Sequence, residues 1–309
     1  MAPWDTGRIL AVAILVAVGS LLPAPAMGQA PEGSEPTELL VRYEYQGRRA
    51  YGRVEDGVVH ELPGADIFTA AVSAPTGRRY ALESVRLLQP LEPELVEKVL
   101  GVALNTPQPG RSGRAPEPRW FAMFPSSLNG HEGDVEIPEE ARNVTYAGGL
   151  VVIVGREGRH IPVGSAGEYV WGITIGNDFS EISWYGERAG AAAPGRIPAK
   201  ATDGWAPLGP YVARGVDYAE LAVVTRLNGD VVQSGPAGDL ITSVPELISN
   251  ISRYVTLKPG DLIFVGTVPY REGARRVLRP GDEVEVEIQG LGVLRNRIVP
   301  MQPGLGGRP

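Results

Sequence analysis

The stretch VTYAGGLVVIVG, residues 144–155, constrains the fold of this chain more than any other. Its second half, Leu150 to Val154, is a continuous aliphatic run, mostly β-branched, that ends at Gly155. Such a run is typical of a strand buried on both faces of a sheet. Just before it, the stretch Tyr146 to Gly149, which is mostly small residues, would let the backbone pass close to a ligand. The sequence therefore predicts a central strand with a binding site near its start.

A second strand pattern, Ile173 to Ile175, leads into Gly176, Asn177 and Asp178. This predicts a strand that ends in a turn carrying a carboxylate. A carboxylate at a strand end is a common way to hold a hard cation or a substrate. An Asp at such a place can equally be a turn cap. The pattern alone leaves both interpretations open.

The first 28 residues have the features of a secretory signal segment. Arg8 precedes an apolar run from Ile9 to Val18, and small residues at 26–28 offer a cleavage position before Gln29. The apolar run is short for a bilayer span. We therefore expect an exported protein, periplasmic or secreted, with no membrane association after cleavage. A linker should follow over residues 29–36.

The composition excludes several classes of protein. The formal net charge is −7, so there is no basic surplus to indicate a nucleic-acid partner. The chain has no cysteine, which excludes disulfides and thiol chemistry in an oxidising compartment. Its 40 glycines and 28 prolines fit many short strands joined by tight turns better than a helical bundle.

The chain is expected to form two domains. Residues 37–97 form a small β-rich N-terminal domain, in which residues 39–45, 50–54 and 58–62 have strand patterns. Gln-Gly and Asp-Gly pairs between these strands predict hairpin turns. Residues 98–302 form the larger C-terminal domain, followed by a flexible tail at 303–309.

One helix is predicted in the larger domain. Ser243 and Glu246 have the spacing of a capping box, with Pro245 in the first turn. Apolar residues then recur at helical spacing from Leu247 to Val255.

No nucleophile elbow, phosphate loop, dinucleotide fingerprint or zinc-type cluster is present in the sequence.

Taken together, the motifs resemble the fumarylacetoacetate hydrolase (FAH) family. The resemblance is carried, in order between about Thr37 and Pro300, by VRLLQPLEPELVEKVLGVALN, FPSSLNGHEGD, VTYAGGLVVIVG, GNDFS, PAKATDGWAPLGPYV, LKPGDLIFVGT and RPGDEVEVEIQGLGVLRNRIV. It implies a mainly β (α+β) fold, in which a mixed β-sheet roll follows a small N-terminal β-rich domain. It also implies a homodimer.

The resemblance further implies a divalent cation, Mg²⁺ or Mn²⁺, held by three carboxylates. Asp178 matches one of them and is the single metal ligand predicted. Ala147 and Gly149 stand where the family has two Glu. We therefore expect the cation to be weakly bound or absent. Glu at both positions would project from the same strand face and should restore a three-carboxylate site.

Other family positions imply the remaining site residues. Lys200 and Asp203 are the implied catalytic residues, because they stand where the family has a Lys that contacts substrate or metal-bound water and an Asp close by. Lys200 has a rationale of its own, since an ammonium stabilises developing negative charge. Ser126, Lys200 and Thr267 are the implied substrate-binding residues. Pro109 replaces the lid histidine that would serve as general base.

Two functions remain open at this level. The first is an enzyme acting on a small dicarbonyl or keto acid by C–C bond hydrolysis, decarboxylation or isomerisation. The second is a non-catalytic exported protein that binds a small organic acid on the same fold. The loss of two carboxylates and of the lid histidine separates this chain from the usual family mechanism.

Overall fold

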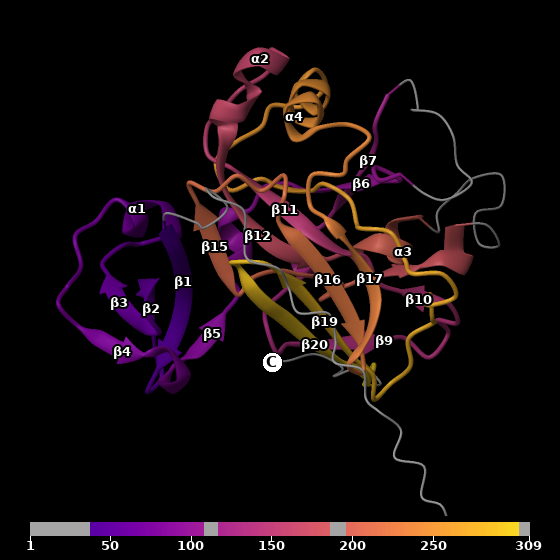
Figure 1. The fold of residues 1–309 in the computed structure, drawn as a ribbon, viewed down its shortest axis with the longest axis horizontal. Coiled ribbons are helices and arrows are strands. Elements are labelled where there is room, and N and C mark those ends of the chain that lie inside the picture. Colours follow the sequence, from indigo (N-terminus) through magenta and orange to yellow (C-terminus); the bar gives the residue numbers. More distant parts are fainter. Residues whose placement is uncertain (1–37, 108–116, 186–195, 303–309) are drawn as a thin grey trace, which may run out of the picture.

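The computed structural model describes residues 38–107, 117–185 and 196–302. The predicted signal segment, the linker, Pro109 and the tail lie outside these ranges. The strands are β1 (Glu38–Tyr45), β2 (Arg48–Glu55), β3 (Val58–Leu62), β4 (Arg79–Ala81), β5 (Arg86–Leu88), β6 (Val99–Ala103), β7 (Arg119–Met123), β8 (Leu128–Asn129), β9 (Asp134–Ile137), β10 (Val144–Thr145), β11 (Gly148–Val154), β12 (Val170–Asn177), β13 (Ser180–Glu181), β14 (Ala206–Pro207), β15 (Tyr211–Arg214), β16 (Ala222–Leu227), β17 (Asp230–Pro236), β18 (Leu262–Phe264), β19 (Glu283–Ile288) and β20 (Gly292–Pro300) (Figure 1).

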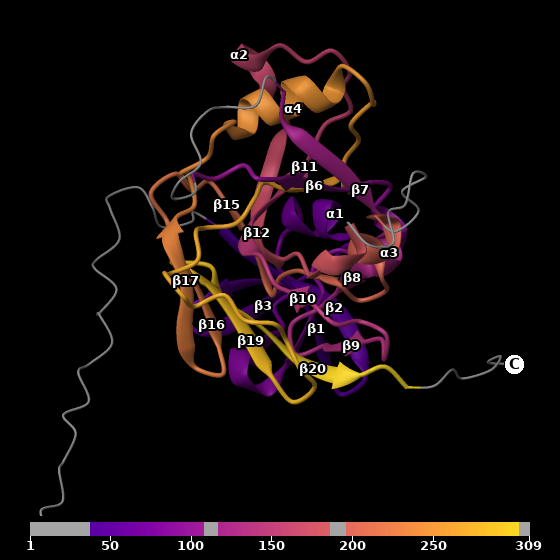
Figure 2. The same cartoon turned by 90° about the vertical axis from the view of Figure 1, so that its right-hand side faces the viewer.

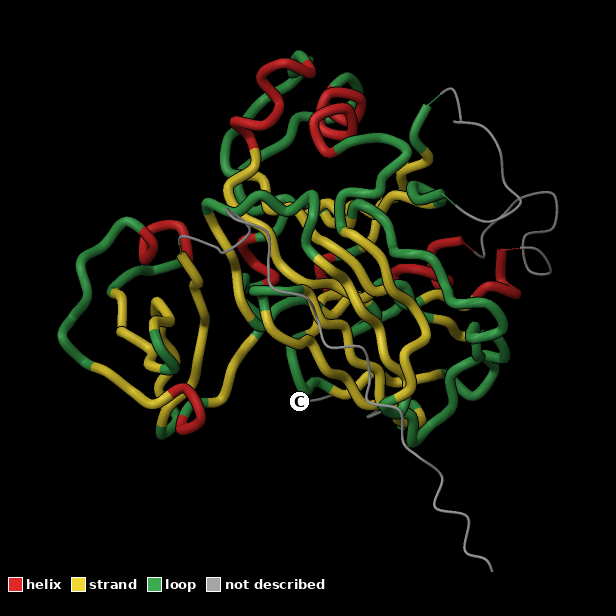
Figure 3. Tube along the Cα trace, in the orientation of Figure 1, coloured by secondary structure: helices red, strands yellow, loops and turns green. Residues whose placement is uncertain are grey.

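The helices are short. They are α1 (Ile67–Ala71), α2 (Val163–Ala166), α3 (Arg196–Ala201) and α4 (Val244–Ser252), with single 3₁₀ turns η1 (Leu82–Ser84), η2 (Pro93–Leu95), η3 (Pro125–Ser127), η4 (Gly167–Tyr169) and η5 (Ile182–Tyr185). They lie around the periphery of the strands (Figure 3). Within the described part of the chain, no helix is long and apolar enough to cross a membrane.

Two mixed sheets organise the molecule. The larger has the strand order β4-β3-β2-β1-β15-β12-β11-β18-β6-β7, with β5 also paired to β1. The smaller has the order β17-β16-β19-β20-β9 and packs against β11 and β12 (Figure 2). Most pairs are antiparallel, but β18 runs parallel to β6 and β20 parallel to β9. The predicted mainly β fold with mixed sheets is confirmed.

Strand β11 lies at the centre of the larger sheet, between β12 and β18. All seven of its residues are buried. Leu150, Val152 and Val154 pack into one hydrophobic cluster with α4 and the smaller sheet. Val151 and Ile153 pack into another on the opposite face. The prediction of a strand buried on both faces is confirmed.

Helix α4 begins where the sequence predicts. The Ser243 hydroxyl and the Glu246 carboxylate form the capping box expected from their spacing. The side chains of Leu247, Ile248 and Ile251 are buried on one face of the helix. They join the hydrophobic cluster that includes one face of β11, and α4 lies near one end of that strand in Figure 2.

The N-terminal strands continue the larger sheet. Strand β1 pairs with β15 of the C-terminal domain along Glu38–Val41, so the small unit, indigo in Figure 1, shares a sheet with the larger domain. Its hairpin turns have positive φ at both central residues, 50° and 79° at Gln46-Gly47 and 49° and 74° at Asp56-Gly57. These are the turns expected for two-residue hairpins that follow the strand twist.

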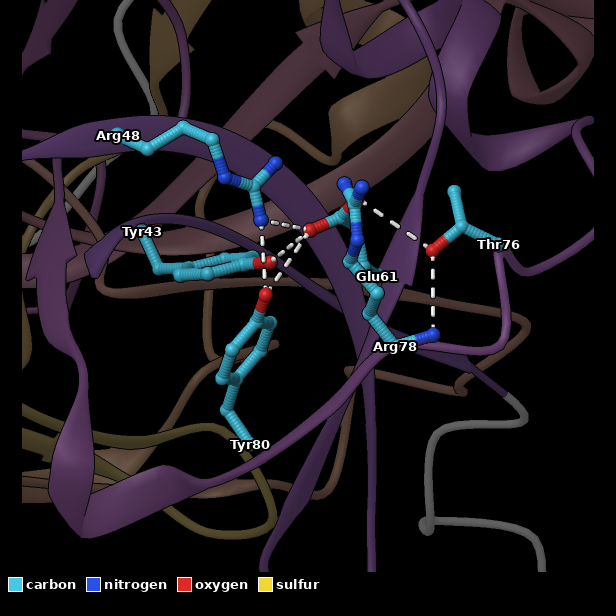
Figure 4. Close-up of polar contacts among 6 residues, drawn as sticks. All are labelled: Tyr43, Arg48, Glu61, Thr76, Arg78 and Tyr80. Atoms are coloured by element: carbon cyan, nitrogen blue, oxygen red, sulfur yellow. Dashed lines mark hydrogen bonds and ion pairs between the residues drawn. The ribbon is translucent and has the colours of Figure 1, made fainter. Parts of the chain in front are cut away.

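A buried carboxylate cross-links the strands of this small unit. Glu61 on β3 accepts hydrogen bonds from Tyr43, Arg48, Arg78 and Tyr80 (Figure 4). Burial alone would raise the pKa of Glu61, but the hydrogen bonds from Arg48, Tyr43 and Arg78 outweigh it and lower the pKa to about 2. The ionised Glu61 carboxylate thus links the strands of this unit.

Candidate functional site

The site predicted from the sequence lies where β12 ends beside the start of β11. Strand pairing places Gly148 opposite Asn177, so the next residues, Ala147 and Asp178, also lie side by side. The Asp178 N–H donates to the Ala147 carbonyl at 3.1 Å. The Asn177 side-chain oxygen accepts the Ala147 N–H at 2.9 Å. These bonds fix the Asp178 backbone against the entry of the central strand.

The short helix α3 brings Lys200 to the same place. The Lys200 ammonium forms an ion pair with Oδ2 of Asp178. A backbone bond from Phe179 to the Trp205 carbonyl, 3.0 Å long, ties the segment after α3 to the residue after Asp178. The Lys200 Nζ atom also lies 4.8 Å from the ring centroid of Phe121 on β7. The pair is therefore anchored from three separate parts of the chain.

This ion pair is mostly shielded from solvent. The side chains of Asp178 and Lys200 are each 13% exposed. Burial raises the pKa of the Asp178 carboxyl, and the neighbouring Lys200 ammonium opposes that shift. The second carboxylate oxygen, Oδ1, is buried and has no hydrogen-bond partner in the described residues. Since buried polar atoms are normally paired, this oxygen marks a place for a ligand or water.

Thr267 lies on the neighbouring connection after β18. Its hydroxyl donates to the Gly148 carbonyl at 2.7 Å and accepts from the Gln233 side-chain amide at 2.9 Å. The hydroxyl thus pins the start of β11. Its side chain is half-buried, and a substrate group would compete with these two bonds for it.

Two aromatic residues flank the site: Tyr146, in the entry stretch before the central strand, and Tyr270, which no sequence motif indicates. The Tyr270 hydroxyl donates to the carbonyl of Tyr146, the residue before Ala147, and the two rings lie 5.6 Å apart. The Arg275 guanidinium lies 5.6 Å from the Tyr270 ring centroid. Burial raises the pKa of the Tyr270 hydroxyl. No motif connects residues 146 and 270, so only the fold shows that they are in contact.

The remaining predicted residues are either exposed or outside the described part of the chain. Asp203 is exposed in the turn after α3, and Ser126 is exposed in η3. Their roles remain predictions. Pro109, the position matched to the lid histidine, lies outside the described residues. The structure thus brings Lys200 and Asp178 together and leaves Asp203 and Ser126 at the surface.

The residues present do not fit the divalent cation that the resemblance implies. Asp178 supplies one carboxylate, but the Lys200 ammonium already contacts it. Ala147 and Gly149 supply no side-chain oxygen. Across 38–107, 117–185 and 196–302, no group of three or more His, Cys, Asp or Glu side chains could hold a metal ion.

The structure also corrects the expectation that two substitutions to Glu would restore a metal site. A Cβ added to Gly149 would lie 3.3 Å from the Gly266 carbonyl carbon, and nearer still to the oxygen that this carbonyl points toward it. Backbone therefore fills the space that a side chain at 149 needs. Ala147 is half-buried and already carries a Cβ.

The sequence is similar to known proteins along most of its length. The fumarylacetoacetate hydrolase C-terminal family model matches residues 98–299, and the Rv2993c-like N-terminal model matches residues 39–90. An uncharacterised protein of Archaeoglobus fulgidus is 36% identical over 72% of this chain and 86% of its own length. A human mitochondrial oxaloacetate tautomerase is 34% identical over 66% of this chain and 67% of its own length.

Solved structures show the same fold. The 5-carboxymethyl-2-hydroxymuconate delta-isomerase of Mycobacterium smegmatis superposes with a TM-score of 0.72 at 29% identity, over 86% of this chain and 100% of that one. The fumarylacetoacetate hydrolase of Exiguobacterium antarcticum superposes with a TM-score of 0.75 at 27% identity, over the same shares. Because the family model spans most of the C-terminal domain, the chain belongs to the fumarylacetoacetate hydrolase family.

Proposed function

We propose that this protein acts on a small dicarbonyl or keto acid, and that its reaction is isomerisation by proton transfer next to a carbonyl. The observation that carries the proposal is the buried Lys200–Asp178 pair, with one carboxylate oxygen left free, at the start of the central strand. The names of two similar proteins, an oxaloacetate tautomerase and a hydroxymuconate isomerase, support the same class of substrate and reaction.

The two side chains have complementary tasks in such a reaction. Conversion of an enol to its keto form removes a proton from the enol oxygen and adds one to the neighbouring carbon. The Asp178 carboxylate would take the first proton and return it to the carbon. The Lys200 ammonium would stabilise the negative charge on oxygen while the proton is in transfer. A positioned acid–base group of this kind typically contributes about 10²–10⁴-fold.

Hydrolysis is less well supported by the residues of this chain. It requires a base that activates water, and the family position for that base is Pro109. The three histidines are at 60, 131 and 160. Nδ1 of His131 accepts a hydrogen bond from the backbone N–H of Arg295 at 3.2 Å. Nε2 of His60 lies 3.8 Å from the Glu55 carboxylate within the N-terminal unit. Isomerisation needs no activated water and therefore fits the site better.

A non-catalytic protein that binds a small organic acid is the second candidate. It is favoured by the closure of the Gly149 position by Gly266, which removes a family ligand position altogether. Export to the periplasm or beyond, a homodimer and the absence of a tightly bound Mg²⁺ or Mn²⁺ belong to the proposal in either form.

The test is an assay of oxaloacetate enol–keto conversion, with acylpyruvate hydrolysis and oxaloacetate decarboxylation measured in parallel. Wild type should accelerate the tautomerisation, and Asp178→Asn and Lys200→Met should each lower the rate about 100-fold or more. Lys98→Met, which alters another lysine–aspartate pair, is the control and should stay within a few-fold of wild type. A wild type that binds these acids without accelerating any of the three reactions would establish the second candidate instead.

A further inference from the structure

Two buried lysine–aspartate pairs in this protein differ in one respect. Asp261, fully buried after α4, accepts hydrogen bonds from the backbone N–H groups of Lys98 and Lys258, at 3.0 and 2.8 Å, and from the Lys98 ammonium at 3.1 Å. Both of its carboxylate oxygens are therefore satisfied within the protein. This is the pattern of a structural pair, which joins β6 to the turn before β18.

Asp178, in contrast, does not have hydrogen-bond partners for both of its carboxylate oxygens within the described residues. Its side chain has the Lys200 ammonium on Oδ2, and Oδ1 is buried with no partner among the described residues. Leaving a buried charged acceptor unpaired is costly, so such an oxygen is maintained where a ligand or water completes it. The Phe121 ring covers the ammonium from one side, which limits its contact with bulk water.

We infer that the Lys200 ammonium is the resident cation of this site, in place of the family's divalent ion, and that the site binds its acid without a metal. The inference rests on the proposed function and specifies its ligand. A carboxylate or carbonyl oxygen of the ligand would approach Lys200. A hydroxyl of the ligand would donate to Oδ1 of Asp178. An enol or 2-hydroxy acid carries both groups.

The charges at the site favour this assignment. A divalent ion on Oδ1 of Asp178 would share the carboxylate with the Lys200 ammonium on Oδ2, and the two cations would repel each other at close range. Mg²⁺ prefers near-octahedral oxygen coordination, and carboxylates supply its protein ligands. The second position on this strand, Gly149, is closed by the Gly266 backbone. The lysine thus supplies positive charge where the strand cannot supply negative ligands.

The experiment is calorimetric binding of tartronate and malonate, which differ by one hydroxyl and are not isomerised. Titrations use the full mature protein, once with a chelator and once with Mn²⁺. We expect tartronate to bind equally in both conditions and at least 10-fold more tightly than malonate. Lys200→Met should weaken tartronate at least 10-fold, whereas Lys200→Arg and the control Lys98→Met should retain chelator-resistant binding.

The outcomes separate this inference from the function on which it rests. Tartronate binding that requires Mn²⁺ and is lost with chelator would overturn the resident-cation inference while leaving an acid-binding site in place. Binding to neither acid in either condition would overturn the proposed function itself. If Lys200→Met does not fold, Lys200→Arg decides the matter, because loss of chelator-resistant binding on keeping the charge would also count against the inference. Equal affinity for tartronate and malonate would refute the hydroxyl contact to Asp178.

Discussion

Gly149→Ala is the substitution that best tests the geometry at the start of β11. The added methyl group would lie 3.3 Å from the Gly266 carbonyl carbon and 3.5 Å from the Thr267 Cα, with the Gly266 oxygen between. A C=O bond is about 1.23 Å long, so an oxygen that points toward the methyl group lies about that much nearer to it than the carbonyl carbon does. The oxygen would therefore have to retreat by roughly 1 Å to restore ordinary contact. The obstacle is backbone, which cannot rotate away as a side-chain end can.

The energetic cost can be worked from these contacts. Overpacking a closed site costs about 1–3 kcal/mol. Moving Gly266 also disturbs the hydrogen bond from the Thr267 hydroxyl to the Gly148 carbonyl, which contributes about 1 kcal/mol. We therefore expect Gly149→Ala to lower the free energy of unfolding by about 2–4 kcal/mol. For a chain of this size that corresponds to a fall in Tm of roughly 4–16 °C.

The measurement is urea denaturation of wild type and variant, compared by midpoint at unchanged slope. Gly164→Ala is the matched control, because it lies in helix α2 and an added Cβ there would meet nothing within 4 Å. The control should be neutral or stabilise by up to about 1 kcal/mol. A loss of less than ~0.5 kcal/mol for Gly149→Ala, within the range of ordinary surface changes, would refute the closure of this position.

Three further predictions concern other parts of the molecule. Calorimetry of the wild type should give a Kd for Mn²⁺ above about 10 μM, since affinity in oxygen sites follows the number of ligand charges; tighter binding at Asp178 would contradict the donor count. The pKa of Glu61 is lowered from 4.5 to about 2, so the ionised carboxylate stabilises the fold above pH 4.5, and this stabilisation, on the order of 3 kcal/mol, is lost as pH falls toward 2. Glu61→Gln should therefore flatten the acid dependence of the urea midpoint. A variant whose midpoint falls with pH as steeply as that of the wild type would argue against this role of Glu61. Finally, N-terminal sequencing of protein from its native host should begin near Gln29, and retention of Met1 would show that the signal segment is not cleaved.

Much of the fold follows from short-range patterns in the sequence. The aliphatic run 150–154 predicts a strand buried on both faces, because continuous β-branched residues suit no half-exposed element. The Gln46-Gly47 and Asp56-Gly57 pairs predict their hairpins, because glycine adopts the positive φ of a two-residue turn without steric cost and Asp tolerates it. Ser243 and Glu246 predict where α4 begins, because a capping box involves residues only three positions apart. Each of these signals lies within a few residues of the structure it determines.

What the tertiary structure alone decides are contacts between distant segments. The sequence indicates both Lys200 and Asp178 as site residues, but only the packing of α3 beside the end of β12 shows that they form an ion pair. The sequence likewise presents Gly149 as a position that could carry a side chain. The Gly266 backbone closes it, because the connection after β18 crosses the start of β11 at close range. The distance between two residues along the sequence does not tell whether the fold brings them into contact. The balance of charges at this site is therefore a property of the folded protein.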